Sequence, residues 1–350
     1  MSAIRMGITA LPTVFLRLIL ATMLGLAGTA PVQADPVEEF YKSKVLNLIL
    51  GFATGGGYDT YGRTIARHMP RHIPGQPTIV VQNMPGGGSL RAANYLYNVP
   101  PKDGSVIGMI SSATAFEPMF GNKAAQFDTP QFSWIGNVDE TIGTCGVWHA
   151  SGVTKFEDLL EKEITFGGTA EGGVGVQHVM ALKNLFGAKI KLIRGYEGAN
   201  GINLALQRGE VDGACALALS SLKVSWQDDW RSGRLKPIVQ LAIEKHPDLP
   251  GVAHIYDYAK TEEDRQVFDL IFGRHVLGRP LVGPPKLPAE RLAALREAFL
   301  ATMKDPLLLA DAEKLDLEIT PSSGAEVEET MRRFFAYPQS VVEKAVAAME

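Results

Sequence analysis

The sequence has few cysteines, no excess of positive charge and, beyond residue 34, no long apolar run. Lys and Arg number 34 against 38 Asp and Glu, so the formal net charge is −4. This weak acidity argues against a nucleic-acid binder, because a phosphate backbone requires a concentrated basic surface. With 46% apolar residues, the chain has the composition of a soluble globular protein. Its 350 residues are enough for two domains or one large one.

The only cysteines are Cys145 and Cys215, and they do not form a C-x-x-C pair. A redox or zinc site of that type is therefore excluded. In an oxidising compartment the two could form a disulfide bond. Their separation in sequence does not show whether they are close, so a bridge and two buried thiols both remain open.

Residues 1–34 have the features of a secretory signal peptide. Arg5 and Arg17 precede an uncharged apolar run from Leu18 to Gly28, and Val32-Gln33-Ala34 is a small-residue cleavage site before Asp35. The run is too short to span a bilayer, and no cysteine follows it to carry a lipid anchor. We expect cleavage after Ala34 and an exported mature protein.

Several catalytic and metal-binding motifs are absent. The segment Gly86-Gly87-Gly88-Ser89 is not a nucleophile elbow, because Arg91 stands where that motif requires glycine. Residues 55–60 lack the spacing of a dinucleotide loop, and there is no Walker lysine. His68 and His72 are four apart, but a proline lies between them and no H-E-x-x-H exists. We therefore expect no catalytic residue, no metal and no cofactor.

Strand-like runs alternate with helix-like segments along the mature chain. The strand-like runs are 45–50, 78–81, 106–110, 164–166, 191–194, 211–214 and 238–241, and the helix-like segments are 60–69, 90–97, 180–186, 201–208 and 292–303. This alternation predicts an α/β fold with right-handed crossovers and a mostly parallel sheet in each of two lobes. Ligands of such sheets bind beyond the carboxyl ends of the strands.

Glycine-rich loops and a serine pair stand at those strand ends. Glycine lets the backbone approach a ligand, and a helix N-terminus favours negative charge, so these loops can hold a carboxylate without Lys or Arg. The predicted ligand-binding residues are Phe52, Ala53, Thr54, Gly55, Gly56, Gly57, Tyr58, Asp59, Pro85, Gly86, Gly87, Gly88, Ser89, Ser111, Ser112, Gly168, Thr169, Ala170, Glu171, Gly172, Tyr196, Ser220 and Ser221.

Some of these residues also have a structural interpretation. Asp59 stands where an N-cap is expected, and capping is the preferred role. Ser111 and Ser112 either cap the next helix or contact the ligand. Glu171 is either a solvated loop acid or an acceptor for a ligand group. Tyr196 either walls a cleft or packs between the lobes.

Six segments, in order along almost the whole mature chain, resemble the substrate-binding receptors of tripartite tricarboxylate transporters, also called Bug or TctC-like receptors. The segments are 52–59, 76–88, 102–104, 195–198, 208–213 and 245–252. The chain departs from the family at Arg91, at Glu197 and in the loop 169–176, which carries an acid and few hydroxyls. These departures leave the ligand's identity open.

The resemblance implies a periplasmic binding protein of the Venus-flytrap, type II-like class. One lobe would comprise 35–140 plus 250–350 and the other 141–249. Such a protein is a monomeric receptor in the periplasm and not an enzyme. It captures a small organic carboxylate between its lobes and delivers it to a membrane permease of one large and one small subunit. The alternatives are an exported hydrolase of α/β type and a receptor for an ABC transporter.

Overall fold

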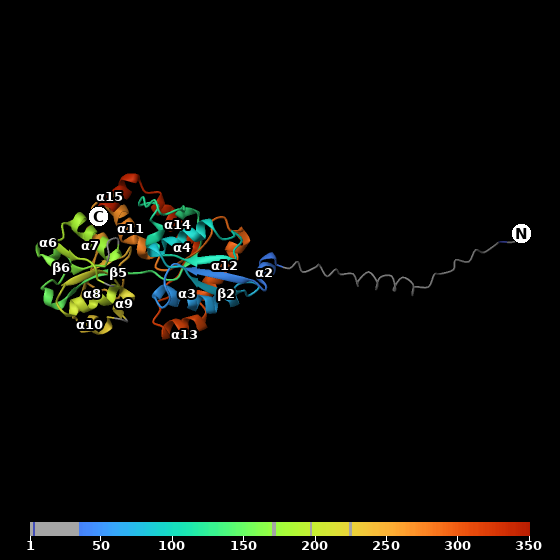
Figure 1. The fold of residues 1–350 in the computed structure, drawn as a ribbon, viewed down its shortest axis with the longest axis horizontal. Helices are drawn as coiled ribbons and strands as arrows, with labels where there is room; N and C mark the ends of the chain where they lie inside the picture. Colours follow the sequence, from blue (N-terminus) through green and yellow to red (C-terminus); the bar gives the residue numbers. More distant parts are fainter. Residues whose placement is uncertain (1–2, 4–34, 170–172, 197, 224–225) are drawn as a thin grey trace.

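The structure, a computed structural model, describes residue 3 and residues 35–169, 173–196, 198–223 and 226–350. The predicted signal peptide lies outside the described residues, apart from Ala3, and so do Ala170, Glu171, Gly172 and Glu197. Among the described helices, none has both the length and the apolar character needed to cross a bilayer. Figure 1 shows two bodies side by side, each built on one sheet with helices on both faces.

The first sheet has the strand order β12-β4-β11-β3-β1-β2. Its strands are β1 (Val45–Leu50), β2 (Thr78–Asn83), β3 (Val106–Met109), β4 (Ser133–Asn137), β11 (Pro280–Gly283) and β12 (Ser322–Ser323). β1 pairs in parallel with β2 and β3, whereas β11 runs antiparallel between β3 and β4. The helices of this first lobe are α2 (Pro36–Tyr41), α3 (Gly57–His68), α4 (Leu90–Asn98), α5 (Ser112–Ala115), α12 (Ala289–Met303), α13 (Pro306–Lys314) and α14 (Gly324–Phe335).

The second sheet has the order β10-β9-β5-β8-β6-β7. Its strands are β5 (Gly143–Trp148), β6 (Ile164–Gly167), β7 (Ile190–Ile193), β8 (Gly213–Ala218), β9 (Leu235–Leu241) and β10 (Ala253–His254). All of them run the same way except β5, which is antiparallel to both of its neighbours. The helices of this second lobe are α6 (Asp158–Glu161), α7 (Val174–Phe186), α8 (Gly198–Gln207), α9 (Leu219–Lys223), α10 (Gln227–Arg231), α11 (Glu262–Ile271) and α15 (Gln339–Met349). The predicted α/β fold with a mostly parallel sheet in each lobe is confirmed.

Alternating side chains of β1 explain why helices cover both faces of the first sheet. Successive strand residues point to opposite faces. Leu48 and Leu50 are fully buried in one apolar cluster with residues of α3 and α12, whereas Ile49 belongs to another with residues of α4 and α14. A largely apolar strand such as β1, whose one polar residue is Asn47, is what burial on both faces requires.

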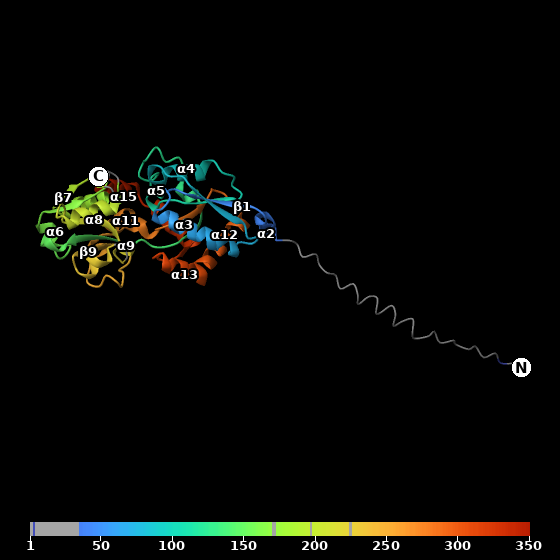
Figure 2. The same ribbon diagram turned by 60° about the horizontal axis from the view of Figure 1, so that its bottom comes forward.

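The chain crosses between the lobes at 138–142, at 272–279 and between α14 and α15. The predicted division, with 35–140 plus 250–350 in one lobe and 141–249 in the other, remains a prediction. In the structure β10 pairs with β9, and both α11 and α15 contact α7, so these parts of 250–350 lie against the second lobe. Figure 2 shows the same arrangement, with α15 beside α11.

Candidate functional site

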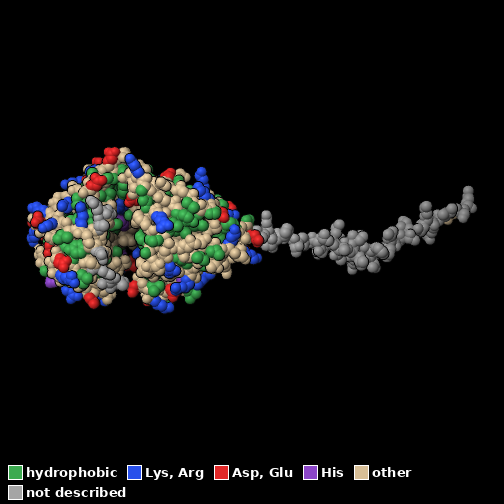
Figure 3. All heavy atoms as spheres, in the orientation of Figure 1, with side chains coloured by type: hydrophobic (Ala, Val, Ile, Leu, Met, Phe, Trp, Pro, Cys, Tyr) green, Lys and Arg blue, Asp and Glu red, His purple; other side chains and the backbone are tan. Residues whose placement is uncertain are grey.

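A cavity of about 310 Å³ lies where the two lobes face each other. Figure 3 shows the molecule hollowed along the boundary between the lobes. The lining residues follow β1 and β3, lie at the start of β5 and the end of β8, belong to the N-terminal parts of α3, α5 and α7, or come from the crossing segments 138–142 and 272–279. This volume is at the lower end of the range for small-molecule sites.

Two stacked aromatic rings form the first-lobe wall of the cavity. Phe52 and Tyr58 stack with their ring centroids 3.9 Å apart. The Tyr58 hydroxyl donates a hydrogen bond to the carbonyl oxygen of Gly278 at 2.7 Å. Burial raises the pKa of Tyr58 to about 12, so the phenol stays protonated and keeps this bond across the physiological range. The wall is therefore apolar and held in place.

Ser111 and Ser112 line the cavity at the start of α5, and Ser111 is the N-cap residue of this helix. The Ser111 N–H donates to the buried Ser89 hydroxyl at 3.2 Å, and the Thr114 hydroxyl donates to the Gly88 carbonyl oxygen at 2.6 Å. These bonds fix the glycine-rich loop 86–89 onto α5. Ser89 therefore supports the site from inside the protein and does not line the cavity.

Asp59 is buried and holds the first glycine-rich loop in place. The N-cap of α3 is Gly56, so the expectation that Asp59 caps the helix is wrong by three positions. Its carboxylate accepts hydrogen bonds from the Gly55 N–H at 3.0 Å, from Asn83 Nδ2 at 2.9 Å and from Arg63 Nε at 2.9 Å. The bond from Arg63 is the main cause that lowers the pKa of Asp59 to about 2. This carboxylate is fully engaged within the protein and does not line the cavity.

The second-lobe wall consists of small residues and two histidines. Gly143 lies close to His178, because a Cβ on Gly143 would come within 3.9 Å of His178 Cε1. The rings of His178 and His275 meet edge to face with centroids 5.2 Å apart. Burial lowers the pKa of His178 to about 3 and, with help from the Arg274 charge, also lowers the pKa of His275 far below its usual value. Both imidazoles are therefore neutral at neutral pH.

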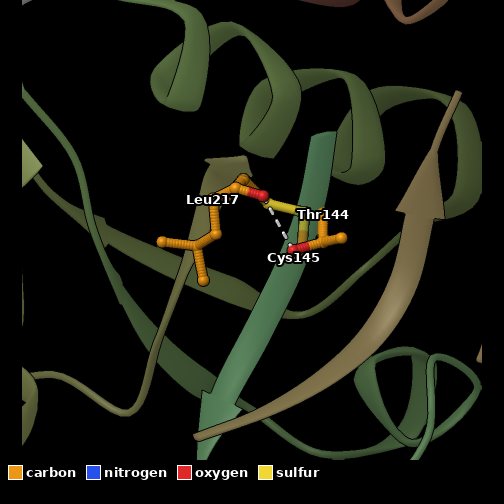
Figure 4. The surroundings of a disulfide bond; sticks show 4 residues. Thr144, Cys145 and Leu217 are labelled. Atoms are coloured by element: carbon orange, nitrogen blue, oxygen red, sulfur yellow. Dashed lines mark hydrogen bonds between the residues drawn. A yellow bond between two sulfur atoms is a disulfide. The ribbon is translucent and has the colours of Figure 1, made fainter. Parts of the chain in front are cut away.

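A disulfide bond joins the two strands behind this wall. Cys145 on β5 and Cys215 on β8 stand opposite each other in the antiparallel pair and are bridged. The neighbouring Thr144 hydroxyl donates to the Leu217 carbonyl oxygen at 2.9 Å (Figure 4). Ala216, with a positive φ of 59°, is the extra residue of a β-bulge between these two pairs, and it lines the cavity.

Arg279 is the cationic side chain among the described lining residues. Its Nη1 pairs with the carboxylate of Asp139, and its guanidinium carbon lies 4.1 Å from the ring centroid of Tyr61. Asp139 is 1% exposed, and this burial raises the pKa of its carboxyl to about 6 against the opposing effect of Arg279. The ion pair and the ring together fix the guanidinium at the edge of the cavity.

The structure brings together only part of the predicted ligand-binding set. Phe52, Tyr58, Ser111 and Ser112 line the cavity. The other described members of the set do not line it: Ala53, Thr54, Gly55, Gly56, Gly57, Asp59, Pro85, Gly86, Gly87, Gly88, Ser89, Gly168, Thr169, Tyr196, Ser220 and Ser221. Their role in ligand binding remains a prediction.

Residues of the crossing segments were missed, Arg279 above all. The sequence signal for Arg279 is weak, since it is a single basic residue between Gly278 and Pro280. Over the described ranges, no three His, Cys, Asp or Glu side chains are grouped as metal ligands would be.

Comparison with known proteins supports the resemblance seen in the sequence. No family model matches the chain. It is 26% identical over 279 residues to the "UPF0065 protein in the TAR-I ttuE-ttuC' intergenic region" of Agrobacterium vitis, which covers 78% of this chain and 75% of that protein. A TctC solute-binding protein from Polaromonas has the same fold, with a TM-score of 0.68 and 18% identity over 87% of this chain and 99% of that one. An R. palustris protein determined with adipate has a TM-score of 0.61 and 18% identity over 86% of this chain and 97% of that one.

These similarities confirm the resemblance to Bug or TctC-like receptors and the two-lobed binding-protein fold. The Polaromonas protein is a solute-binding protein. The prediction that the chain is a non-enzymatic receptor agrees with this.

Proposed function

We propose that the chain is a periplasmic receptor that captures a small organic carboxylate between its lobes. The observation that best supports this is a cavity between the lobes whose described lining holds one arginine and no acid. An anion is the ligand that this lining favours, because the Arg279 guanidinium, although paired with Asp139, can still donate charged hydrogen bonds, and no acidic side chain among the described lining residues would repel an anion. A protein of the same fold was determined with adipate, and this also supports a carboxylate as the ligand.

The loop Ala53 to Tyr58 is the proposed contact for a carboxylate group. It leads into α3, a helix of 12 residues whose N-cap is a glycine without a side-chain cap bond. The N–H groups of the first helical turn have no partner inside a helix and favour an anion. The loop Met84 to Ser89, held on α5, would supply further backbone donors, while residues 168–173, Tyr196 and Ser220-Ser221 would set specificity in a closed form.

Binding is proposed to close the lobes about the crossing segments 138–142 and 272–279. In receptors of this kind, hinge closure brings loops of both lobes onto one ligand. Closure would carry the exposed loops beside the cavity toward it. It would also present a ligand-dependent surface to a permease of one large and one small subunit.

A thermal-shift screen of residues 35–350 tests the binding proposal. The compounds are di- and tricarboxylates, aromatic acids and amino acids, and calorimetry follows each positive result. A ligand at one hundred times its Kd stabilises the native state by about 2.7 kcal/mol, which gives a clear shift. Stabilisation by no carboxylate would contradict the proposal, and turnover of ester or amide substrates would favour the exported hydrolase.

Export and delivery need separate measurements. Mass spectrometry of the exported protein is expected to show a start at Asp35, and an intact Met1 would contradict cleavage. Ligand uptake by cells should require the tripartite permease together with this receptor. If uptake instead requires an ABC permease, the tripartite permease is not the partner, and the proposal that the receptor binds a carboxylate still stands.

A further inference from the structure

The guanidinium of Arg279 has one nitrogen free to meet a ligand. Nη1 is taken by Asp139, and Nε is buried and has no hydrogen-bond partner among the described residues. Nη2 also donates to no acceptor among the described residues, but it does not belong to the buried unpartnered atoms. Nη2 lies 3.7 Å from the point where a Cβ on Gly57 would stand, so it reaches the first residue of α3. The Arg279 side chain is 19% exposed, which leaves this nitrogen reachable from the cavity.

The rest of the described lining offers no second positive charge. Val174, Ala216 and Ala218 of the second lobe line the same cavity as Phe52 and Tyr58 of the first. The two histidines are neutral at neutral pH, as burial and the nearby Arg274 dictate. A second carboxylate placed here would lose its hydration without gaining a cation.

The negative charge of Asp139 is a second reason why the cleft holds only one carboxylate group. When ionised, it balances Arg279, so the pair as a whole is neutral. A ligand with one carboxylate adds a single negative charge, which Nη2 and nearby backbone donors can share. A ligand with two carboxylates adds a second charge against an apolar wall, and like charges in such a site repel strongly.

We propose that the cleft selects a monocarboxylate with an uncharged apolar body, whose carboxylate is held by Arg279 Nη2 and whose body lies against Phe52 and Tyr58. This rests on the proposed function, which it narrows from carboxylates in general to one class of them. The aromatic pair suits a flat or extended carbon skeleton, because stacked rings give a large apolar contact area.

Matched probes test the charge preference by calorimetry. Hexanoate and adipate share a six-carbon skeleton and differ in having one or two carboxylates, and benzoate and terephthalate form a second such pair. The monocarboxylate of each pair is expected to bind at least tenfold more tightly, equivalent to about 1.4 kcal/mol. Equal or tighter binding of adipate and terephthalate would overturn the inference while leaving the proposed function standing. If no carboxylate of any kind binds, both fail.

Paired substitutions test the role of Arg279 itself. Arg279→Gln alone would leave the buried Asp139 without its cation, so the double variant Arg279→Gln/Asp139→Asn is the proper test. The matched control is Arg234→Gln/Asp229→Asn, because Arg234 Nε binds the buried Asp229 at 2.6 Å and neither residue lines the cavity. Thermal unfolding without ligand checks that both variants fold.

The cleft variant is expected to lose at least tenfold in affinity for the tighter-binding monocarboxylate, and the control to bind as the parent does. Parental affinity in the cleft variant would overturn the inference. Should the cleft variant not fold, Arg279→Lys keeps the charge beside Asp139 but loses the second nitrogen of the fork. It is then expected to bind more weakly, and unchanged affinity in this variant would equally overturn the inference.

Discussion

Removing the Cys145–Cys215 bridge should lower the stability of the protein by a predictable amount. The bridge closes a chain segment with a sequence separation of 70, and both cysteines are buried. A crosslink of this span restricts the unfolded chain, and the loop-entropy relation gives about 4 kcal/mol at 25 °C. That is a large share of the roughly 5–15 kcal/mol by which native proteins are stable.

Urea unfolding of the mature protein, with and without a reductant, measures this loss. Tryptophan fluorescence is a suitable signal, because Trp148 on β5 and Trp226 before α10 are buried in the second lobe. The variant Cys145→Ala/Cys215→Ala is the control. It should unfold near the reduced parent and should not respond to reductant. Without denaturant the reduced protein should stay folded, since the β5–β8 ladder and the Thr144 bond remain.

Two outcomes would refute this reasoning. If unreduced, unfolded protein shows two titratable thiols, the bridge does not exist. If the bridge is present but reduction leaves the unfolding midpoint unchanged, the unfolded chain is not restricted as the entropy argument requires. The second result would mean that the segment between the cysteines remains compact after unfolding.

Three further predictions concern the loop before α3 and the motion of the lobes. A Cβ on Gly56 would meet only the Ala53 carbonyl oxygen, at 4.0 Å, so Gly56→Val should fold. In calorimetry Gly56→Val should nonetheless abolish carboxylate binding, whereas Thr54→Ala should weaken carboxylate binding little. If both variants bind the ligand, the loop Ala53 to Tyr58 does not hold the carboxylate. Asp59 has its pKa lowered from 3.8 to about 2, so its ionised form stabilises the fold above pH 4 and this contribution is lost as the pH falls through 2. Asp59→Asn should therefore unfold at lower urea concentrations at pH 7, with the difference from the parent shrinking toward pH 2. X-ray scattering should show a more compact protein with saturating ligand, and identical curves would count against closure.

The strands that the sequence predicted well are those with a continuous apolar character. Residues 45–50 form β1 with the predicted bounds, and 78–81 form most of β2. The strands β4, β5 and β11 were missed because each contains glycine and none has the long apolar run or the regular alternation that marks a strand in the sequence. Their places are set by pairing with strands distant in the sequence, which a local pattern does not contain.

The sequence predicted which segments form helices more accurately than it predicted where these helices begin. The predicted helix 60–69 is α3, which begins at Gly57 because Gly56 adopts the extended backbone of an N-cap. The expected helix 180–186 is the second half of α7, whose first turn, beginning at Val174, follows a glycine-rich loop. In both cases glycines hide the first helical turn, and that turn lies at the cavity.

The missed residues of the site follow from two of the reversed strands, β11 in the first sheet and β5 in the second. β11 runs antiparallel to β3 with Leu281 opposite Met109, so the residue two before Leu281 lies beside the residue two after Met109. Those residues are Arg279 and Ser111, and both line the cavity. A reversed strand therefore brings the residues before it to the edge where its parallel neighbours end.

The second sheet repeats this arrangement. β5 runs antiparallel to β8 with Gly143 opposite Ala218, so the start of one strand meets the end of the other, and both residues line the cavity. The rule that ligands bind at the carboxyl ends of parallel strands predicts only the residues that follow such strands. Where a chain enters a sheet in reverse after crossing from the other lobe, the residues before the strand belong to the same site. This places Arg279, which has no motif around it, opposite the glycine-rich loop that the sequence did predict.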